Sequence, residues 1–451
     1  MDSEHSFYRR DLFKLTTSFL KPLAFSPFLP ESPDTIKFEG KRLMFETIQI
    51  GPIRESSVSV LGNGTRAIWF DAENIEHLIA GTENDGTFET QDMGRTWKKL
   101  VIPFNKERPV QTLRDIVSLD EKDQSILLVF DKHLVLGFKR NNSFLFEDVT
   151  PNLTDNTYQT ACFDPKNKNI IVGCQNIAGG LLSSKYSEIK SSFLSNLKSG
   201  EKRATYNWLN IVKINTPGST LTRSITKDKD KIYVGGWGNA DNRVSRAGVS
   251  ICLDANTLEQ TTNPYNLTDS LGDLPVNSQK VIDYQDTSGV QHKIFISGAE
   301  RGNYVLKNNL FTLNERDNFL NIFVDGFRLP DDVTNCNQIY EQNNSPIVTC
   351  AHGIEEMRIV GERYVVISLY SKNLLFVPTQ ELVDVATNFN FSKRLDWISI
   401  PKPILGETTM SAAHMRIIPD KNGVNDTILL ARINETTKSF PQVLLLKPKL
   451  K

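Results

Sequence analysis

The sequence predicts an all-β protein in which seven units of four short strands follow one another around a closed ring. One observation is an apolar strand, ending in glycine in its clearest copies, that recurs seven times. Another is a strand with an aromatic residue, an aliphatic residue three positions later and then a proline. The last unit lacks this second strand, but a spare copy stands before the first unit. Together these observations predict a seven-bladed β-propeller closed by its N-terminal strand.

The apolar strand marks the middle of each unit. Its four clearest copies share a final glycine: Gly81, Gly173, Gly235 and Gly298. Three weaker copies lack this glycine: residues 127–130, 348–351 and 429–432. A blade in a ring is covered on both faces by its neighbours, so a middle strand such as residues 125–130 can be continuously apolar.

The aromatic strand marks the end of a unit. With the apolar strand it divides the chain into residues 67–103, 113–151, 158–217, 221–268, 278–323, 333–402 and 410–449. Residues 44–50 carry the spare copy and can complete the last unit, which would leave only short, protected sheet edges. Short helices are expected at residues 187–197 and 381–388. A pair of β-sandwiches, or a ring of six or eight blades, stays open because the sixth unit is long.

The first unit contains a turn motif that favours the same fold. Residues 90–97 match the pattern Ser/Thr-x-Asp-x-Gly-x-Thr-Trp at every fixed position, with Thr90, Asp92, Gly94, Thr96 and Trp97. The aspartate can accept backbone and hydroxyl hydrogen bonds within a tight turn, and glycine adopts a positive φ without steric strain. The tryptophan can pack between neighbouring sheets, and we expect Trp97 to pack against the next blade along the chain. The motif therefore concerns the fold rather than the chemistry of a site.

Through this motif the chain resembles the Asp-box, or BNR-repeat, β-propellers of the sialidase-like superfamily. That superfamily includes sialidases, sortilin-type receptors, xyloglucan hydrolases and a photosystem II assembly factor. The resemblance implies that the Asp-box lies on the rim, away from any active site. A sialidase would need its Arg-Ile-Pro type signature, which is absent here, and nothing singles out the two opposed carboxylates of a xyloglucanase. No catalytic residue is therefore carried over.

The candidate binding residues come from the expected geometry of the ring. In a propeller, the loops between the second and third strands of every blade converge on one face. The polar and aromatic candidates in or beside these loops are Glu83, Asp85, Trp237, Arg243, Glu300, Arg301, His352 and Arg432. Arginine can clamp a carboxylate and tryptophan can stack on a sugar ring or an apolar side chain, although each residue can also be an ordinary polar loop tip. We expect a non-catalytic protein that binds a protein or glycan; the alternative is a glycoside hydrolase.

Composition and motifs exclude several other classes. The formal net charge is −1, which does not favour nucleic acid as a partner. No apolar run reaches the roughly 18–20 residues that span a bilayer. The chain has no CxxC motif, no clustered histidines and no glycine-rich phosphate loop, so we expect no metal and no cofactor. We also expect a monomer. Five cysteines leave two hypotheses open: buried free thiols, or bridges joining Cys162 to Cys174 and Cys336 to Cys350.

The N-terminal segment, residues 1–35, is expected to be a tail outside the propeller of residues 36–451. Residues 8–15 resemble a twin-arginine export signal, with the phenylalanine and leucine of that signal exchanged. Polar residues and Lys21 interrupt the apolar stretch that follows, and no cleavage site is evident. We expect export to the periplasm, the cell surface or the medium. The alternative is a cytoplasmic protein with an amphipathic or disordered tail.

Overall fold

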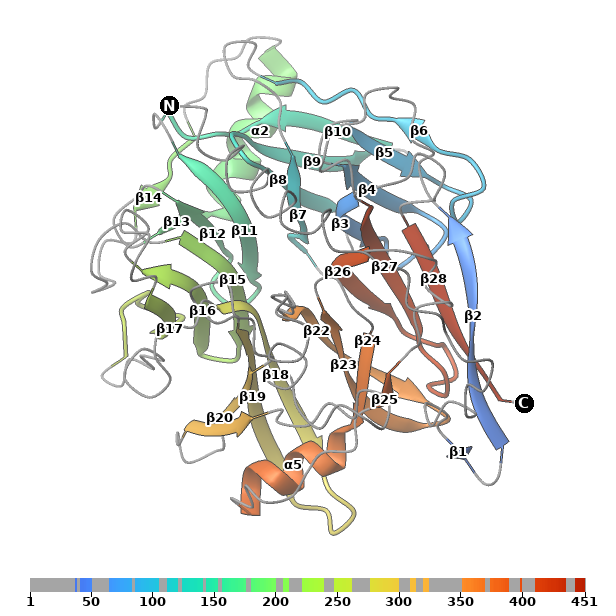
Figure 1. Cartoon of the computed structure of the whole chain (residues 1–451). Helices are drawn as coiled ribbons and strands as arrows, with labels where there is room; N and C mark the ends of the chain where they lie inside the picture. The colour runs from blue at the N-terminus through green and yellow to red at the C-terminus, as the bar shows by residue number, and fades with distance from the viewer. Residues whose placement is uncertain are drawn as a thin grey trace, which may run out of the picture.

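Figure 1 shows the computed structural model of the chain. The structure describes residues 37–38, 41–50, 65–82, 86–104, 112–120, 124–140, 143–152, 156–175, 180–199, 206–210, 221–238, 247–261, 276–299, 309–313, 319–323, 351–369, 374–388, 398–399, 410–434 and 443–450.

The described strands form seven sheets, and their pairs are antiparallel. The first sheet contains β3 (Thr65–Phe70), β4 (Leu78–Thr82), β5 (Thr87–Thr90) and β6 (Lys98–Lys99). The second contains β7 (Leu113–Ser118), β8 (Ser125–Phe130), β9 (Leu134–Arg140) and β10 (Ser143–Asp148). The third contains β11 (Thr157–Asp164), β12 (Asn169–Gln175), β13 (Leu181–Lys185) and β14 (Leu209–Asn210). The fourth contains β15 (Leu221–Asp228), β16 (Lys231–Gly238) and β17 (Ala247–Asp254).

The remaining sheets follow the same plan. The fifth contains β18 (Val276–Gln285), β19 (Gln291–Ala299), β20 (Asn309–Leu313) and β21 (Phe319–Phe323). The sixth contains β22 (Ala351–Ile359), β23 (Glu362–Leu369), β24 (Leu374–Pro378) and β25 (Ile398–Ser399). The seventh contains β26 (Met410–Ile418), β27 (Thr427–Asn434), β28 (Val443–Leu450), β2 (Lys41–Ile50) and β1 (Lys37–Phe38). The prediction of an all-β chain is confirmed, and the described sheets are antiparallel and mostly four-stranded.

In the described part of the chain, two helices interrupt the strand pattern at the places the sequence predicted. Helix α2 (Tyr186–Ser199) follows β13, and helix α5 (Thr379–Asn388) follows β24, so each stands between the third and fourth strands of its sheet. Helix α2 buries Tyr186, Ile189 and Phe193 against the core shared by the second and third sheets. This spacing of three and four residues is that of one helix face.

The first strands of the sheets lie innermost. They contact one another in chain order, from β3 through β7, β11, β15, β18 and β22 to β26, and β26 in turn contacts β3. In Figure 1 the sheets fan out around these strands. Strand β2 pairs with β28, with Leu43 opposite Leu450 and Ile50 opposite Val443, so segments from the two ends of the sequence lie side by side.

The hydrophobic core lies between neighbouring sheets. All six residues of β8 are buried, as expected for a strand with a sheet on each side. The recurrent glycine has the same origin. A Cβ added at Gly81 would lie 2.2 Å from Cδ2 of Leu113, and one added at Gly173 would lie 2.6 Å from Cγ2 of Thr222. Leu113 is the first residue of β7 and Thr222 the second residue of β15, the first strands of the next sheets, so the glycines permit close packing between sheets.

Aspartates at the ends of first strands form ion pairs with the next sheet, a feature that the sequence analysis missed. Lys139 binds Asp71, and Lys293 binds Asp228 with an N–O distance of 2.5 Å. In both pairs the aspartate follows or ends the first strand of one sheet, and the lysine comes from the sheet that follows in the chain. The pairs therefore hold neighbouring sheets together at the end where first strands finish.

The turn at residues 90–97 is closed by Asp92. Its Oδ1 accepts hydrogen bonds from the Thr90 hydroxyl at 2.7 Å and the Thr96 amide at 2.8 Å, while Oδ2 accepts the Thr96 hydroxyl at 2.6 Å. These hydrogen bonds lower the pKa of Asp92 to about 2. Gly94 has a φ of 81°. Trp97 is partly buried against the core shared with the seventh sheet, and not against the next sheet along the chain.

Candidate binding site

The predicted binding residues fall largely outside the part of the chain that the structure describes. Five of them lie outside the described residues altogether: Glu83, Asp85, Arg243, Glu300 and Arg301. Trp237, His352 and Arg432 lie in β16, β22 and β27, but the structure does not describe their side chains. The register places Trp237 opposite Leu221 and Arg432 opposite Ala412, near the starts of first strands. The assignment of a shared binding role to these residues stays a prediction.

A cavity of about 700 Å³ lies between the innermost strands, and all seven first strands contribute to its lining. This volume is within the range of roughly 300–1,000 Å³ that is usual for ligand sites. Five lysine or arginine side chains and three carboxylates line it, so the described walls carry an excess of positive charge.

A β-bulge occurs at the same position near the start of every first strand. A bulge adds one residue to a strand and redirects its side chain. The seven bulged residues are Arg66, Arg114, Gln159, Arg223, Asn277, His352 and Ala413. The first five line the cavity, and each carries an N–H donor. We call these five residues the donor row.

Two members of the donor row are oriented by neighbouring side chains. Arg114 binds both carboxylate oxygens of Asp131 through Nε and Nη2, in a forked arrangement. Nη1 of Arg223 donates a hydrogen bond to Oε1 of Gln159 at 3.2 Å, which links the fourth sheet to the third. A forked pair fixes the direction of a guanidinium better than a single contact does. The row is therefore partly organised before any ligand arrives.

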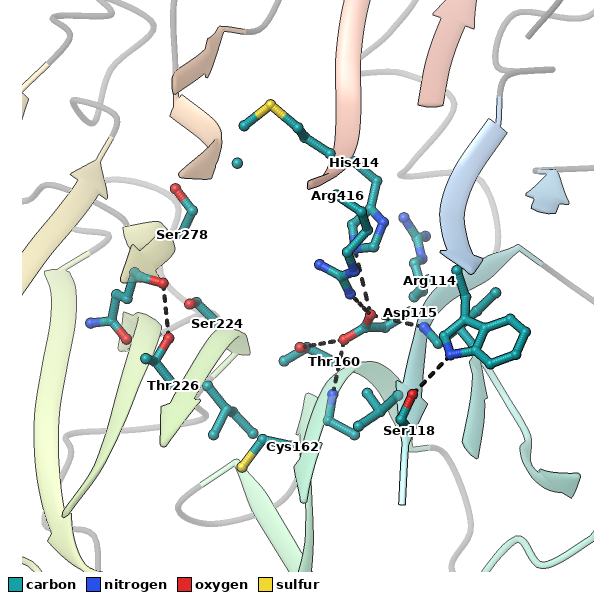
Figure 2. A pocket seen from close by; sticks show the side chains of 18 of the residues that line it. Arg114, Asp115, Ser118, Thr160, Cys162, Ser224, Thr226, Ser278, His414 and Arg416 are labelled. Carbon is teal, nitrogen blue, oxygen red and sulfur yellow. Dashed lines mark hydrogen bonds and ion pairs between the residues drawn. The ribbon is translucent and has the colours of Figure 1, made fainter. Parts of the chain in front are cut away.

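Asp115 lies at the centre of the polar wall of the cavity, as Figure 2 shows. Its Oδ2 accepts a hydrogen bond from the Thr160 hydroxyl at 2.9 Å, and its Oδ1 accepts one from the amide of Ile116 at 2.8 Å. Nη2 of Arg416 donates to Oδ1 at 3.3 Å. Burial acts to raise the pKa of Asp115, but His414, Arg416 and Thr160 together hold it below its usual value. This carboxylate is charged and fully engaged.

His414 joins the seventh sheet to the first and second. Its Nδ1 accepts a hydrogen bond from the amide of Ile68 at 3.2 Å, so the neutral ring carries its proton on Nε2, which faces Oδ1 of Asp115 at 3.5 Å. Burial and the charge of Arg416 lower the pKa of His414, against the opposing effect of Asp115. His414 and Asp115 each follow a bulge, and the corresponding residue on the strand between them is Ala67, which leaves room for them to meet.

A chain of alternating charges continues from this wall. Nη1 of Arg416 lies 3.7 Å from Oε1 of Glu355, and Nζ of Lys280 lies 2.5 Å from Oε2 of Glu355. Across the gap in Figure 2, the labelled side chains Ser224, Thr226 and Ser278 bring hydroxyl groups to the cavity. One wall therefore carries the chain of alternating charges, and the facing wall adds hydroxyl groups beside Arg223.

Other chemistry has little support within the described residues. They contain no group of three His, Cys, Asp or Glu side chains that could hold a metal ion. Among the described carboxyl groups with displaced pKa values, every displacement is downward.

Cys162 and Cys174 are buried free thiols, so no bridge joins them. Burial raises the pKa of each thiol to about 12. Cys336 and Cys350 lie outside the described residues. No helix in the described ranges is long and apolar enough to cross a membrane.

Comparison with models of known protein families and with curated proteins finds no match. Solved structures do match. A chain of U3-55K has a TM-score of 0.51 at 8% identity, over 90% of this chain and 98% of that one. YCF48 from Cyanidioschyzon merolae has a TM-score of 0.49 at 9% identity, over 89% and 98%. A YCF48 chain bound to a D1 peptide has a TM-score of 0.47 at 9% identity, over 92% and 99%.

These likenesses are distant in sequence, and they concern the fold alone. The likeness to U3-55K, together with the seven fanned sheets, defines the class of this protein: it is a β-propeller. Membership of the Asp-box family stays a prediction, which rests on one turn, Thr90 to Trp97.

Proposed function

We propose that the chain is a seven-bladed β-propeller that binds a protein partner and does not catalyse a reaction. The seven described sheets and the chain-order contacts of their first strands support the blade count. The pairing of β2 with β28 supports closure by the N-terminal strand. Such a ring presents a rigid rim of loops and a central cavity, which suits it to recognition.

The partner segment is acidic, and it binds at the end of the cavity where first strands begin. The donor row carries this proposal. Arginine, glutamine and asparagine side chains at the same bulge of five successive strands offer N–H groups and no carboxylate. Trp237 and Arg432, near the starts of their neighbouring first strands, would extend the same face. Arginines in a partly enclosed site favour carboxylate groups.

The alternative, a glycoside hydrolase, has weaker support. Such an enzyme needs a carboxylic acid that stays protonated near neutral pH beside a second, ionised carboxylate. Asp115, the most enclosed carboxyl group of the cavity, has its pKa displaced in the opposite direction. Its oxygens are also occupied by Thr160, Ile116 and Arg416. A binding role fits this arrangement better.

The test is fluorescence anisotropy with labelled peptides of six glutamates or six lysines, alongside a glycan array. We expect only the glutamate peptide to bind wild-type protein. Arg66→Gln and Arg223→Gln should each weaken it about ten- to a hundredfold, as loss of one charge-assisted hydrogen bond does. Arg95→Gln is the matched control, because Arg95 is exposed in the turn at residues 90–97. Binding of the lysine peptide, or a glycan as the sole ligand, would contradict the proposal.

Export and a monomeric state complete the proposal. Residues 8–15 alone support export, and the double variant Arg9→Lys, Arg10→Lys tests it. We expect the wild-type protein outside the cytoplasm and the variant inside it, as cell fractionation would measure. Equal distribution of the two proteins would favour the cytoplasmic alternative. Light scattering would measure the oligomeric state.

A further inference from the structure

Arg416 is held more loosely than Arg114 and Arg363, which each form a forked pair with a carboxylate. Its hydrogen bond to Asp115 is 3.3 Å long, and its contact with Glu355 is 3.7 Å. Each contact joins a single nitrogen to a single oxygen. Arg363, by contrast, binds Glu356 through two nitrogens at 2.7 and 2.6 Å. Strong guanidinium–carboxylate pairs are forked and about 2.7–2.9 Å long, so Arg416 is far from the best arrangement.

Arg416 is also accessible from the cavity. Its side chain is 31% exposed, whereas those of its partners Asp115 and Glu355 are 10% and 17% exposed. A guanidinium has five N–H donors, and the contacts above use two of them weakly. An acidic group that enters the cavity can therefore reach Arg416 more readily than it can reach a cation held in a forked pair.

Each carboxylate has hydrogen-bond donors other than Arg416. Glu355 has Lys280 at 2.5 Å, and Asp115 keeps hydrogen bonds from Thr160 and from the amides of Ile116 and Ala161. Breaking a buried ion pair is strongly destabilising when it leaves a charge without a partner. Here both carboxylates would keep hydrogen-bond partners if Arg416 turned toward a ligand, so neither would be left without a donor.

We propose that Arg416 binds one carboxylate of the ligand inside the cavity, beside Asp115, and that Glu355 competes with the ligand for this arginine. The proposal rests on the acidic partner proposed above. On the facing wall, the Ser224 hydroxyl would donate to a peptide carbonyl beside that carboxylate. The Thr226 hydroxyl already donates to the Gln279 carbonyl at 2.8 Å, so it would accept from a peptide N–H. The carboxylate comes from a glutamate or aspartate side chain or from a chain end, and both supply the same chemistry.

Three labelled probes separate these sources: hexaglutamate with an amidated C-terminus, hexaglutamine with a free C-terminus, and hexaglutamine with an amidated C-terminus. The dissociation constants are measured for the wild type, Arg416→Gln, Arg416→Lys, Glu355→Gln and the control Arg95→Gln. Arg416→Gln should weaken the acidic probe about ten- to a hundredfold. Arg416→Lys should restore part of the affinity, because lysine keeps the charge but loses the fork. Arg416→Lys also tests the proposal if Arg416→Gln fails to fold.

Glu355→Gln gives the sharpest outcome. Removing the competing carboxylate should tighten binding about three- to tenfold, and the gain should vanish in the double variant with Arg416→Gln. Loss of affinity in Arg66→Gln and Arg223→Gln without any change in the Arg416 variants would overturn this inference and leave the proposed function standing. Weaker binding by Glu355→Gln would overturn the inference as well. Failure of both carboxylate-bearing probes to bind wild-type protein would overturn both proposals.

Discussion

At the scale of single residues, the cavity wall depends on the hydrogen-bonding roles of the two ring nitrogens of His414. Nδ1 is committed to the amide of Ile68, and only Nε2 carries the proton of the neutral ring. Protonating His414 would place a hydrogen on Nδ1 as well and remove the acceptor that this amide needs. Since Ile68 lies in the first sheet and His414 in the seventh, one proton affects the contact between two sheets.

The stability of the protein should therefore fall as the pH falls. The pKa of His414 is lowered in the folded chain. Below about pH 6.5 the unfolded chain therefore binds a proton more readily than the folded chain does, and the free energy of unfolding decreases. Asp115, whose pKa is also lowered, adds a further loss below about pH 4. Urea unfolding between pH 7.5 and 5 measures the effect, and His414→Gln should flatten it. An identical pH dependence in wild type and variant would contradict this account.

At the scale of strands, part of the architecture could be predicted from sequence and part could not. The apolar strands predicted the sheets because burial on both faces leaves a continuous run such as residues 125–130. The final glycines were visible, although their cause, contact with Leu113 or Thr222 of the next sheet, was not. The donor row was missed because a bulge is a feature of strand pairing, and the sequence alone does not show which residue is left unpaired. An arginine, glutamine or asparagine near the start of five of the seven first strands was the available signal.

The close contact at Gly81 makes a testable pair. Gly81→Ala places a methyl group against Leu113, and overpacking of this kind destabilises by typically about 1–3 kcal/mol. Leu113→Ala leaves a cavity at a buried site, with a loss of about 2–5 kcal/mol. In the double variant the new methyl group fills part of that cavity. The summed losses should therefore exceed the loss in the double variant by more than about 0.5 kcal/mol, in denaturant unfolding. Simple additivity would argue against contact between these positions.

The loops that the sequence analysis favoured belong to the part of the chain outside the described residues, so Arg243 and Arg301 keep their predicted role without a structural account. Packing of Trp97 between two sheets was predicted, but the expected partner, the next sheet along the chain, was wrong. The turn that carries it follows β5, and that side of the first sheet shares its core with Ile418 and Leu445 of the seventh sheet. Sequence repeats give the order of sheets, whereas the face on which an outer turn packs depends on how the sheets are arranged.

At the scale of the whole molecule, the seventh sheet depends on chain segments about four hundred residues apart. Deleting residues 1–35 should leave a folded monomer, because β2 remains. Deleting residues 1–55 removes β2 and leaves β28 as an unpaired edge, which favours aggregation. It also removes Ile48 and Ile50 from the core shared by the first and seventh sheets. Gel filtration and thermal melts compare the two truncations. Closely similar behaviour would contradict closure by β2.

The pairing of β2 with β28 also has a mechanical consequence. The two strands are antiparallel, and Leu43 stands directly opposite Leu450 at one end of the pair. A force that pulls these two residues apart acts along the hydrogen bonds between the strands and breaks them one after another, starting from this end. Shearing the strands lengthwise would load all of the bonds at once. Heat must disrupt the whole pair together, whereas a small tension applied at this end would peel β2 away and leave the other sheets under little load.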